Sequence, residues 1–169
     1  MKNDWRGILK INSLSHVRNG KVIYQEENIY NTLHQLGELF LLNLCFANDG
    51  SLLPANYYFG LDDRTTININ DTISSLTNEP SSGGYLRQAV NSTNGFTISS
   101  VSGIYRAASP TLIFSATGAG FGPVKSLFMV NSADNTGVLI SSAPLSNAVT
   151  LASGDTLNLT MSLQLHDCP

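Results

Sequence analysis

The sequence predicts a mainly β protein, an antiparallel sandwich or barrel with an N-terminal hairpin and one long helix. Apolar and polar residues alternate in short runs after residue 55, and Gly, Ser, Asn and Pro clusters separate these runs. Eight short strands at such spacing are typical of a sandwich or barrel. Only residues 31–48 show a long helical repeat. The expected strands after the helix are 56–61, 84–91, 96–101, 104–108, 111–116, 124–131, 136–142 and 155–166.

The first and last strands carry the clearest local patterns. Residues 7–30 read as a hairpin, because Asn19-Gly20 lies between two strand-like runs and both residues tolerate the positive φ that a tight hairpin turn requires. The alternation on residues 7–17 is imperfect. In residues 155–166, Leu157, Leu159 and Met161 alternate with polar residues, so one face of that strand is expected to be buried.

The predicted helix over residues 31–48 is apolar on nearly every side. Asn31 or Thr32 is expected to cap it, and Asn48-Asp49-Gly50 to end it. A helix this apolar is expected to be buried on several sides, with Cys45 as a buried free thiol. Gly37 weakens the helix relative to Ala and suggests a close crossing with another element.

Length and charge limit the classes of function. We expect the 169 residues to form one compact unit, with the hairpin and helix of residues 1–50 packed on a β domain of residues 51–169. Charged residues make up 12% of the chain and the net charge is −3, so nucleic-acid binding is not expected. The longest apolar run, residues 40–47, is too short to span a bilayer, and no signal peptide is recognised at residues 1–10. We therefore expect no membrane partner and synthesis in a cytoplasm.

No catalytic or metal-binding motif emerges from the residue spacing. The three histidines have no metal-ligand spacing and no cysteine near them, so neither a metal site nor a cofactor is expected. The chain has no Gly-x-Ser-x-Gly elbow and no P-loop. Residues 118–123, GAGFGP, resemble a dinucleotide fingerprint, but Pro123 replaces the last glycine and no strand–helix unit follows.

An acidic loop, LDDRTTININD over residues 61–71, is the strongest candidate for polar chemistry. Its oxygen-bearing side chains, together with Arg64, leave three interpretations open. Asp and Asn side chains could bond to their own backbone while Arg64 neutralises an acid. The same oxygens could bind calcium, or two carboxylates could serve glycoside chemistry. The acidic and amide side chains concerned are Asp62, Asp63, Asp71, Asn68 and Asn70.

Aromatic and basic residues nearby complete the candidate interface or ligand-binding set. Tyr57, Tyr58 and Phe59 could form a platform for sugar, although strand alternation is expected to bury two of the three rings. Arg87 is expected to stack on an aromatic ring or pair with an acid, in a structural or interface role. The complete set is Tyr57, Tyr58, Asp62, Asp63, Arg64 and Arg87.

Two runs of the sequence resemble small structural proteins of tailed bacteriophages. The matching features are a strand that ends in "GL" before the acidic loop, a GY-R-AV run, a V..LF strand, a TG.LI.SA.L hairpin and a closing GD.L strand. Together they cover about two-thirds of the chain and leave out the N-terminal hairpin and helix. They lie at residues 58–63, 84–90, 124–128, 136–145 and 154–165.

The resemblance implies a virion protein with a jelly-roll-like β-sandwich. Such proteins often act as capsid decoration or cement subunits, and some relatives carry tail-fibre labels. We therefore expect a non-enzymatic, homo-oligomeric subunit that binds the phage major capsid protein through broad, charge-poor β surfaces. The alternative is a tail- or fibre-associated module that binds host glycans.

Overall fold

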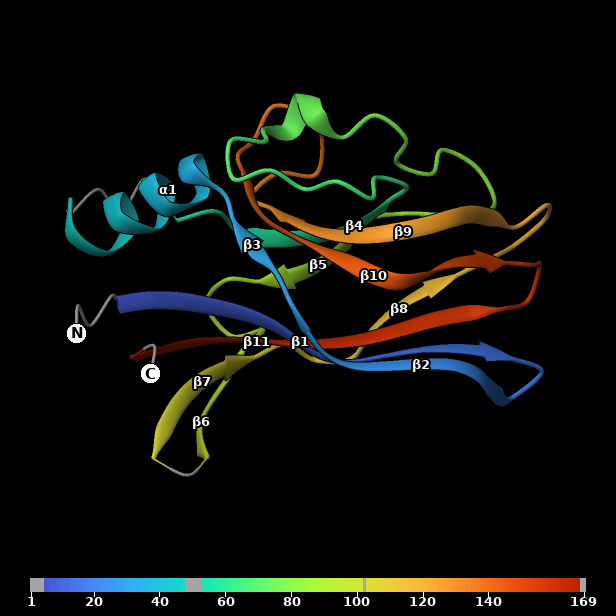
Figure 1. The fold of residues 1–169 in the computed structure, drawn as a ribbon, viewed down its shortest axis with the longest axis horizontal. Coiled ribbons are helices and arrows are strands. Elements are labelled where there is room, and N and C mark those ends of the chain that lie inside the picture. Colours follow the sequence, from blue (N-terminus) through green and yellow to red (C-terminus); the bar gives the residue numbers. More distant parts are fainter. Residues whose placement is uncertain (1–4, 48–52, 102, 168–169) are drawn as a thin grey trace.

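The computed structural model describes residues 5–47, 53–101 and 103–167, and it forms a sandwich of two antiparallel sheets (Figure 1). The first sheet has the order β2-β1-β11-β7-β6, with β8 also paired to β11, and the second has the order β3-β10-β9-β4-β5. The predicted sandwich is therefore confirmed. The elements of the first sheet are β1 (Trp5–Arg18), β2 (Lys21–Tyr30), β6 (Thr97–Val101), β7 (Ile104–Ala108), β8 (Leu112–Ser115) and β11 (Thr156–Asp167). Those of the second are β3 (Thr32–Leu33), β4 (Asn56–Asp62), β5 (Gln88–Asn91), β9 (Phe121–Val130) and β10 (Leu139–Leu151).

Antiparallel pairs nest inside one another along the chain. The first long strand, β1, pairs with the last, β11, while β3 pairs with β10 and β4 with β9. In a jelly roll, successive nested pairs alternate between the two sheets, whereas here the pairs β3–β10 and β4–β9 lie side by side in the second sheet, so the structure is a β-sandwich without full jelly-roll topology. The N-terminal hairpin is therefore part of the sandwich sheet, and the division of the chain at residue 50 stays a prediction.

The core lies between the sheets and consists of residues that alternate along the strands. Leu157, Leu159 and Met161 are buried, as the alternation predicted. The imperfect pattern of β1 has a cause in its geometry. A bulge between Ile11 and Ser13 moves the buried positions from Ile11 to Leu14, so a strict period of two is interrupted.

The tip of the β1–β2 hairpin is fixed to the start of β11 by a buried carboxylate. Asn19 and Gly20 both have positive φ in the turn, as predicted. Asp155 accepts hydrogen bonds from Arg18 Nη2 at 2.6 Å and pairs with His16 Nε2 at 2.8 Å. The hydrogen bonds from Arg18 hold the pKa of Asp155 well below its usual range.

Three predicted elements differ from the structure. The helix α1 (Gln35–Phe46) begins four residues later than predicted, because residues 32–33 pair with β10 as β3 and His34 becomes the N-cap. The predicted strand 84–91 is reduced to β5. The strand predicted to end at residue 142 continues to Leu151, with a register shift between Pro144 and Val149. The predicted stop at Gly50 lies outside the described residues.

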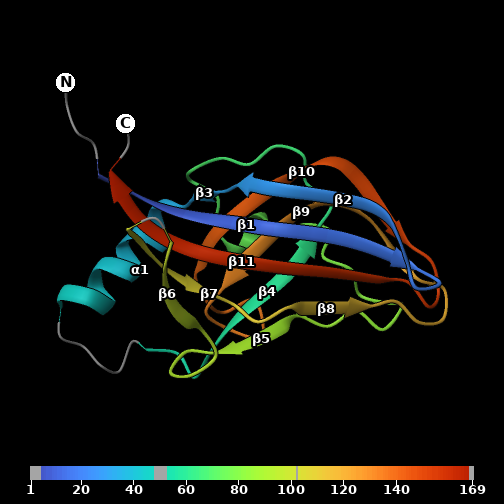
Figure 2. The same ribbon diagram turned by 90° about the horizontal axis from the view of Figure 1, so that it is seen from below.

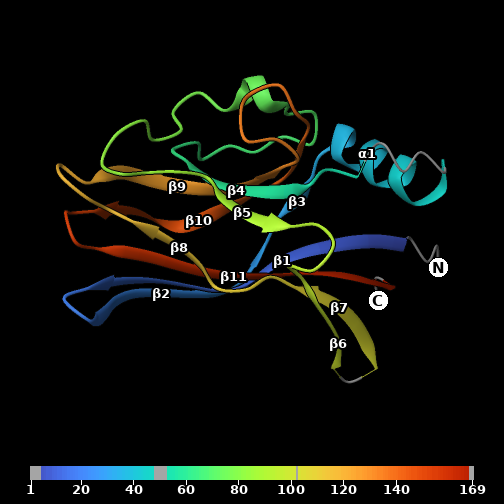
Figure 3. The same ribbon diagram turned by 180° about the vertical axis from the view of Figure 1, so that it is seen from behind.

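Two structures project from the sandwich at the same end. The helix α1 lies beyond the end of the second sheet, and near the same end the β6–β7 hairpin projects away from the first sheet beside β11, as Figure 2 and Figure 3 also show. A loop that contains the 3₁₀ turn η2 (Ile73–Ser75) covers the outer face of the second sheet. None of the described helices is long and apolar enough to cross a bilayer.

Candidate functional site

The aromatic run on β4 faces mainly inward. Tyr57 and Phe59 are buried, and the Tyr57 ring makes edge contacts with Phe40 and Phe96. Tyr58, on the other face of the strand, is partly buried against a smaller cluster around Phe128. The prediction that two of the three rings are core is confirmed, and the run offers a sugar no platform of adjacent exposed rings.

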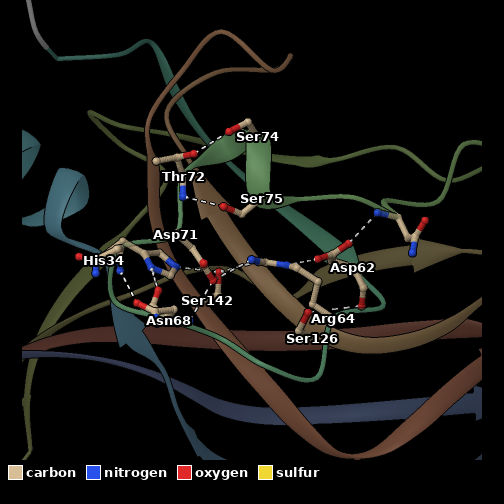
Figure 4. A network of polar contacts seen from close by, with 12 residues as sticks. His34, Asp62, Arg64, Asn68, Asp71, Thr72, Ser74, Ser75, Ser126 and Ser142 are labelled. Atoms are coloured by element: carbon tan, nitrogen blue, oxygen red, sulfur yellow. Dashed lines mark hydrogen bonds and ion pairs between the residues drawn. The ribbon is translucent and has the colours of Figure 1, made fainter.

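The acidic loop folds around Arg64. Asp62 is fully buried, and its carboxylate accepts hydrogen bonds from Arg64 Nε and from the backbone N–H of Asn78 at 3.2 Å (Figure 4). Arg64 Nη1 also donates to Asp71 at 2.9 Å. One guanidinium therefore lies between two carboxylates and balances one of their two negative charges, as the first of the three interpretations expects.

The same network reaches the start of α1. Asp71 also accepts the backbone N–H of Asn68 at 2.9 Å and so orders the loop, while Thr72 is the N-cap of the η2 turn that follows. The fully buried His34 contacts the Asn68 carbonyl through Nδ1 and Ser142 Oγ through Nε2, both at 2.9 Å. Burial lowers the pKa of His34. The helix, the loop and β10 are thus joined at one histidine.

Arg87 belongs to a second closed network at the other side of the loop. Its Nη2 donates to Glu79 at 2.5 Å, and its guanidinium lies 5.2 Å from the ring centre of Phe128. Glu79 also accepts the Tyr85 hydroxyl at 2.8 Å, while the Tyr85 ring packs into the core against Phe114. Burial raises the pKa of Tyr85. Arg87 thus makes both predicted contacts, stacking on a ring and pairing with an acid.

Asp63 is a partly exposed acid of the loop that lies outside the Arg64 network. It accepts both of its side-chain hydrogen bonds from Asn78 Nδ2, at 2.9 and 3.0 Å, and lines an open groove of about 430 Å³. Thr150 and the Pro80 and Pro123 rings also line this groove. Its polar lining can hydrogen-bond a neutral ligand, whereas the carboxylates of Asp62 and Asp71 are already paired with Arg64.

The side chains of the two networks are bonded to one another and to the backbone, and so hold the loop in place. Within the described residues, no three His, Cys, Asp or Glu side chains come together as metal ligands. Arg64 occupies the space between Asp62 and Asp71 that calcium or a scissile sugar bond would need. The geometry therefore favours the structural interpretation of the acidic loop.

The surface that the sequence analysis missed is the outer face of α1. Gly37 and Phe40 are its buried residues, and a Cβ at Gly37 would overlap the Ile140 backbone, so the predicted close crossing is confirmed. The opposite face is apolar and exposed, which contradicts the predicted burial on several sides and the predicted burial of Cys45. We define the α1 stripe as Leu36, Leu39, Leu42 and Phe46, which are 47%, 53%, 55% and 82% exposed.

A second exposed surface lies on the β6–β7 hairpin at the same end. Ile98 is 67% exposed and Tyr105 72% exposed. The register places Ser100 opposite Tyr105 and Ile98 opposite Ala107, so both large side chains share one face of the hairpin. Contiguous exposed apolar side chains of this kind mark interaction sites in soluble proteins.

Comparison with protein families identifies this chain's relatives. Residues 16–165 match the family described as "Podophage GP4 fiber I protein gp80". The chain belongs to this family. The match includes β2 and α1, which the earlier resemblance left out, and it makes the protein a member of a phage structural family. Comparison with curated proteins gives no match.

Proposed function

We propose that this protein is a non-enzymatic structural subunit of the phage particle, associated with a fibre, and that it attaches to another virion protein through the α1 stripe. The exposed stripe is the observation that carries the proposal. Four large apolar side chains lie in solvent on a helix whose other face is already seated on β10. The family description supports the fibre location, and the closed polar networks support the absence of catalysis.

Electrostatics also favour attachment by the stripe. Glu38 is the single charged residue in α1, so a partner can cover the helix with little loss of charge solvation. Repetition of the contact through the particle would then strengthen each weak attachment.

The test is incorporation into particles grown with a Leu39→Ser/Leu42→Ser chain. Both side chains are exposed, so the variant is expected to fold as the parent does but to be lost from purified virions, as measured by quantitative mass spectrometry. A matched Ile113→Ser variant, which changes an exposed residue of β8, should be retained. Full incorporation of the stripe variant would contradict the proposal, and immunogold labelling of the parent at the fibre or head separates the locations.

Capsid decoration is the second candidate location. A charge content of 12% and two extended sheets suit a subunit that covers a lattice of the major capsid protein, and such a subunit would be homo-oligomeric. In that case the gold label would lie on the head, with many copies per particle.

Glycan binding by a fibre subunit is favoured by one further observation, the groove beside Asp63. Carboxylate and amide groups at Asp63 and Asn78 can bond sugar hydroxyls. Binding to host polysaccharide that Asp63→Asn abolishes would establish this activity, and a glycan array without signal would remove it.

A further inference from the structure

We propose that the edge strand β6 pairs with β6 of a second copy of this chain, in an antiparallel, two-fold symmetric arrangement that joins the two first sheets. An edge strand presents unpaired N–H and C=O groups that can bind another strand. Its partner in the chain is β7, and no other described strand pairs with it.

The other edges of the sandwich carry protection that β6 lacks. The strand β2 contains Lys21, Glu26 and Glu27, and Glu26 accepts hydrogen bonds from Ser146 of β10. The strand β3 has two residues and leads directly into α1. The four-residue strands β5 and β8 contact each other across the side of the sandwich. Charge, shortness and coverage are the usual protections of an edge.

By contrast, β6 is an uncharged strand, TISSV, on a hairpin that extends away from the sandwich (Figure 3). The hairpin departs from the sandwich at Ser109-Pro110. On either side of this point the same edge of β11 pairs first with β7 and then with β8. Met161 N–H donates to the Ser109 hydroxyl at 3.1 Å, and the Ser109 N–H donates to the Met161 carbonyl at 2.9 Å. The hairpin is thus joined to β11 by the pairs at residues 106–108, and its outer strand is accessible.

If the two copies of β6 pair with Ser99 at the two-fold axis, large side chains of one copy lie beside small side chains of the other. This register pairs all five residues, with Ser99 opposite its own copy and Ile98 opposite Ser100 of the second chain. Tyr105 lies beside Ser100 on β7, so Ile98 of one copy and Tyr105 of the other meet over a small serine. Their separation is two strand spacings, roughly 10 Å, which the long tyrosine side chain can span. Symmetry repeats the contact, and both exposed side chains become covered.

Charge is compatible with a second copy as the occupant. The strand β6 carries no charge, and Arg106 is the single charged residue of β7. In the proposed pair the two Arg106 positions are three strand spacings apart, roughly 14 Å, beyond the screening length of about 8 Å at physiological salt. The two-fold contact also closes on itself and leaves no β6 edge free for further growth.

A cysteine at the symmetry axis tests the register directly. In the full chain with Cys45 and Cys168 replaced by Ser, Ser99→Cys should form a covalent dimer under mild oxidation, because identical residues face each other there at disulfide distance. Ser100→Cys is the matched control, since it faces Ile98, and should cross-link at least tenfold more slowly. Equal rates for the two variants, or no dimer from Ser99→Cys, would overturn the proposal.

Association of the unmodified chain gives a second, independent measurement. Sedimentation at protein concentrations up to about 1 mM should show a monomer–dimer equilibrium, which Ile98→Lys weakens at least tenfold and Val22→Lys, on the charged β2 edge, leaves unchanged. A monomer at every concentration contradicts the inference, and so does a dimer that is indifferent to Ile98→Lys. Because purified protein is used, neither result depends on incorporation into particles through the α1 stripe.

Discussion

Two regions of the molecule differ in what they bury. These are the loop layer over the second sheet and the end of the molecule that carries α1. The loop layer buries charge, and each carboxylate there has a partner: Asp62 and Asp71 share Arg64, and Glu79 bonds Arg87 and Tyr85. The α1 end exposes the α1 stripe and the apolar face of the β6–β7 hairpin. The first region is complete within this chain, whereas the second is suited to binding another.

The sharpest test of this comparison lies within α1 itself. Phe40→Ala should lower the free energy of unfolding by about 4 kcal/mol, because it empties a buried position that packs against Tyr57. Leu42→Ala removes a similar apolar side chain two residues away and should change stability by less than about 0.5 kcal/mol, because that side chain is 55% exposed. Urea unfolding of both variants measures the difference, and equal losses would show that the stripe is packed within the chain.

The next largest effect is expected in the loop layer. Asp62→Asn should cost about 3 kcal/mol, because it removes a fully buried carboxylate and leaves the nearly buried Arg64 with Asp71 as its acidic partner. The adjacent Asp63→Asn is the control and should have little effect, since Asp63 bonds Asn78 at the surface. Comparable losses for the two variants would contradict the assignment of Asp62 as the buried anchor of the loop.

The smallest effect is a dependence of stability on pH. The folded state holds the pKa of His34 below its unfolded value of about 6.5. Below that pH the unfolded chain binds more protons, so stability should fall as the pH decreases from 7.5 to 5.5, by at most about 1.4 kcal/mol per pH unit.

A His34→Gln variant provides the reference for this measurement, and it should show a flatter profile in urea unfolding over the same range. Parallel profiles would remove His34 as the cause. The lowered pKa of Asp155 does not affect this pH range. Its contribution to stability is lost only below about pH 4, where the carboxyl of the unfolded chain becomes protonated.

Local patterns predicted the fold class, the hairpin turn and the buried face of the last strand, because each of these depends on residues that are near one another in the sequence. The Asn19-Gly20 turn and the alternation of Leu157, Leu159 and Met161 each require a single geometry, and the structure has both. The sequence predicted that Arg87 would pair with an acid or stack on a ring. The identity of that acid, Glu79, was not, because the loop between them has no periodicity that fixes which side chains meet.

The exposure of the α1 stripe could not be predicted from the sequence. A helix that is apolar all round satisfies the same pattern whether its own chain or another chain covers it. Gly37 did identify the face that meets β10, because a close backbone approach requires a residue without a side chain. The exposure of Cys45 follows from its place on the other side of the helix.

The joint at His34 has a mechanical consequence. The His34 N–H donates to the Ile140 carbonyl and the Gln35 N–H to the Ile69 carbonyl, so the first turn of α1 is tied at once to β10 and to the loop. Tension applied to the helix by an anchored neighbour would pass into β10 and spread over its ladder with β9. A subunit built in this way could be pulled by its helix without that helix peeling from the body, since many ladder bonds would share the strain.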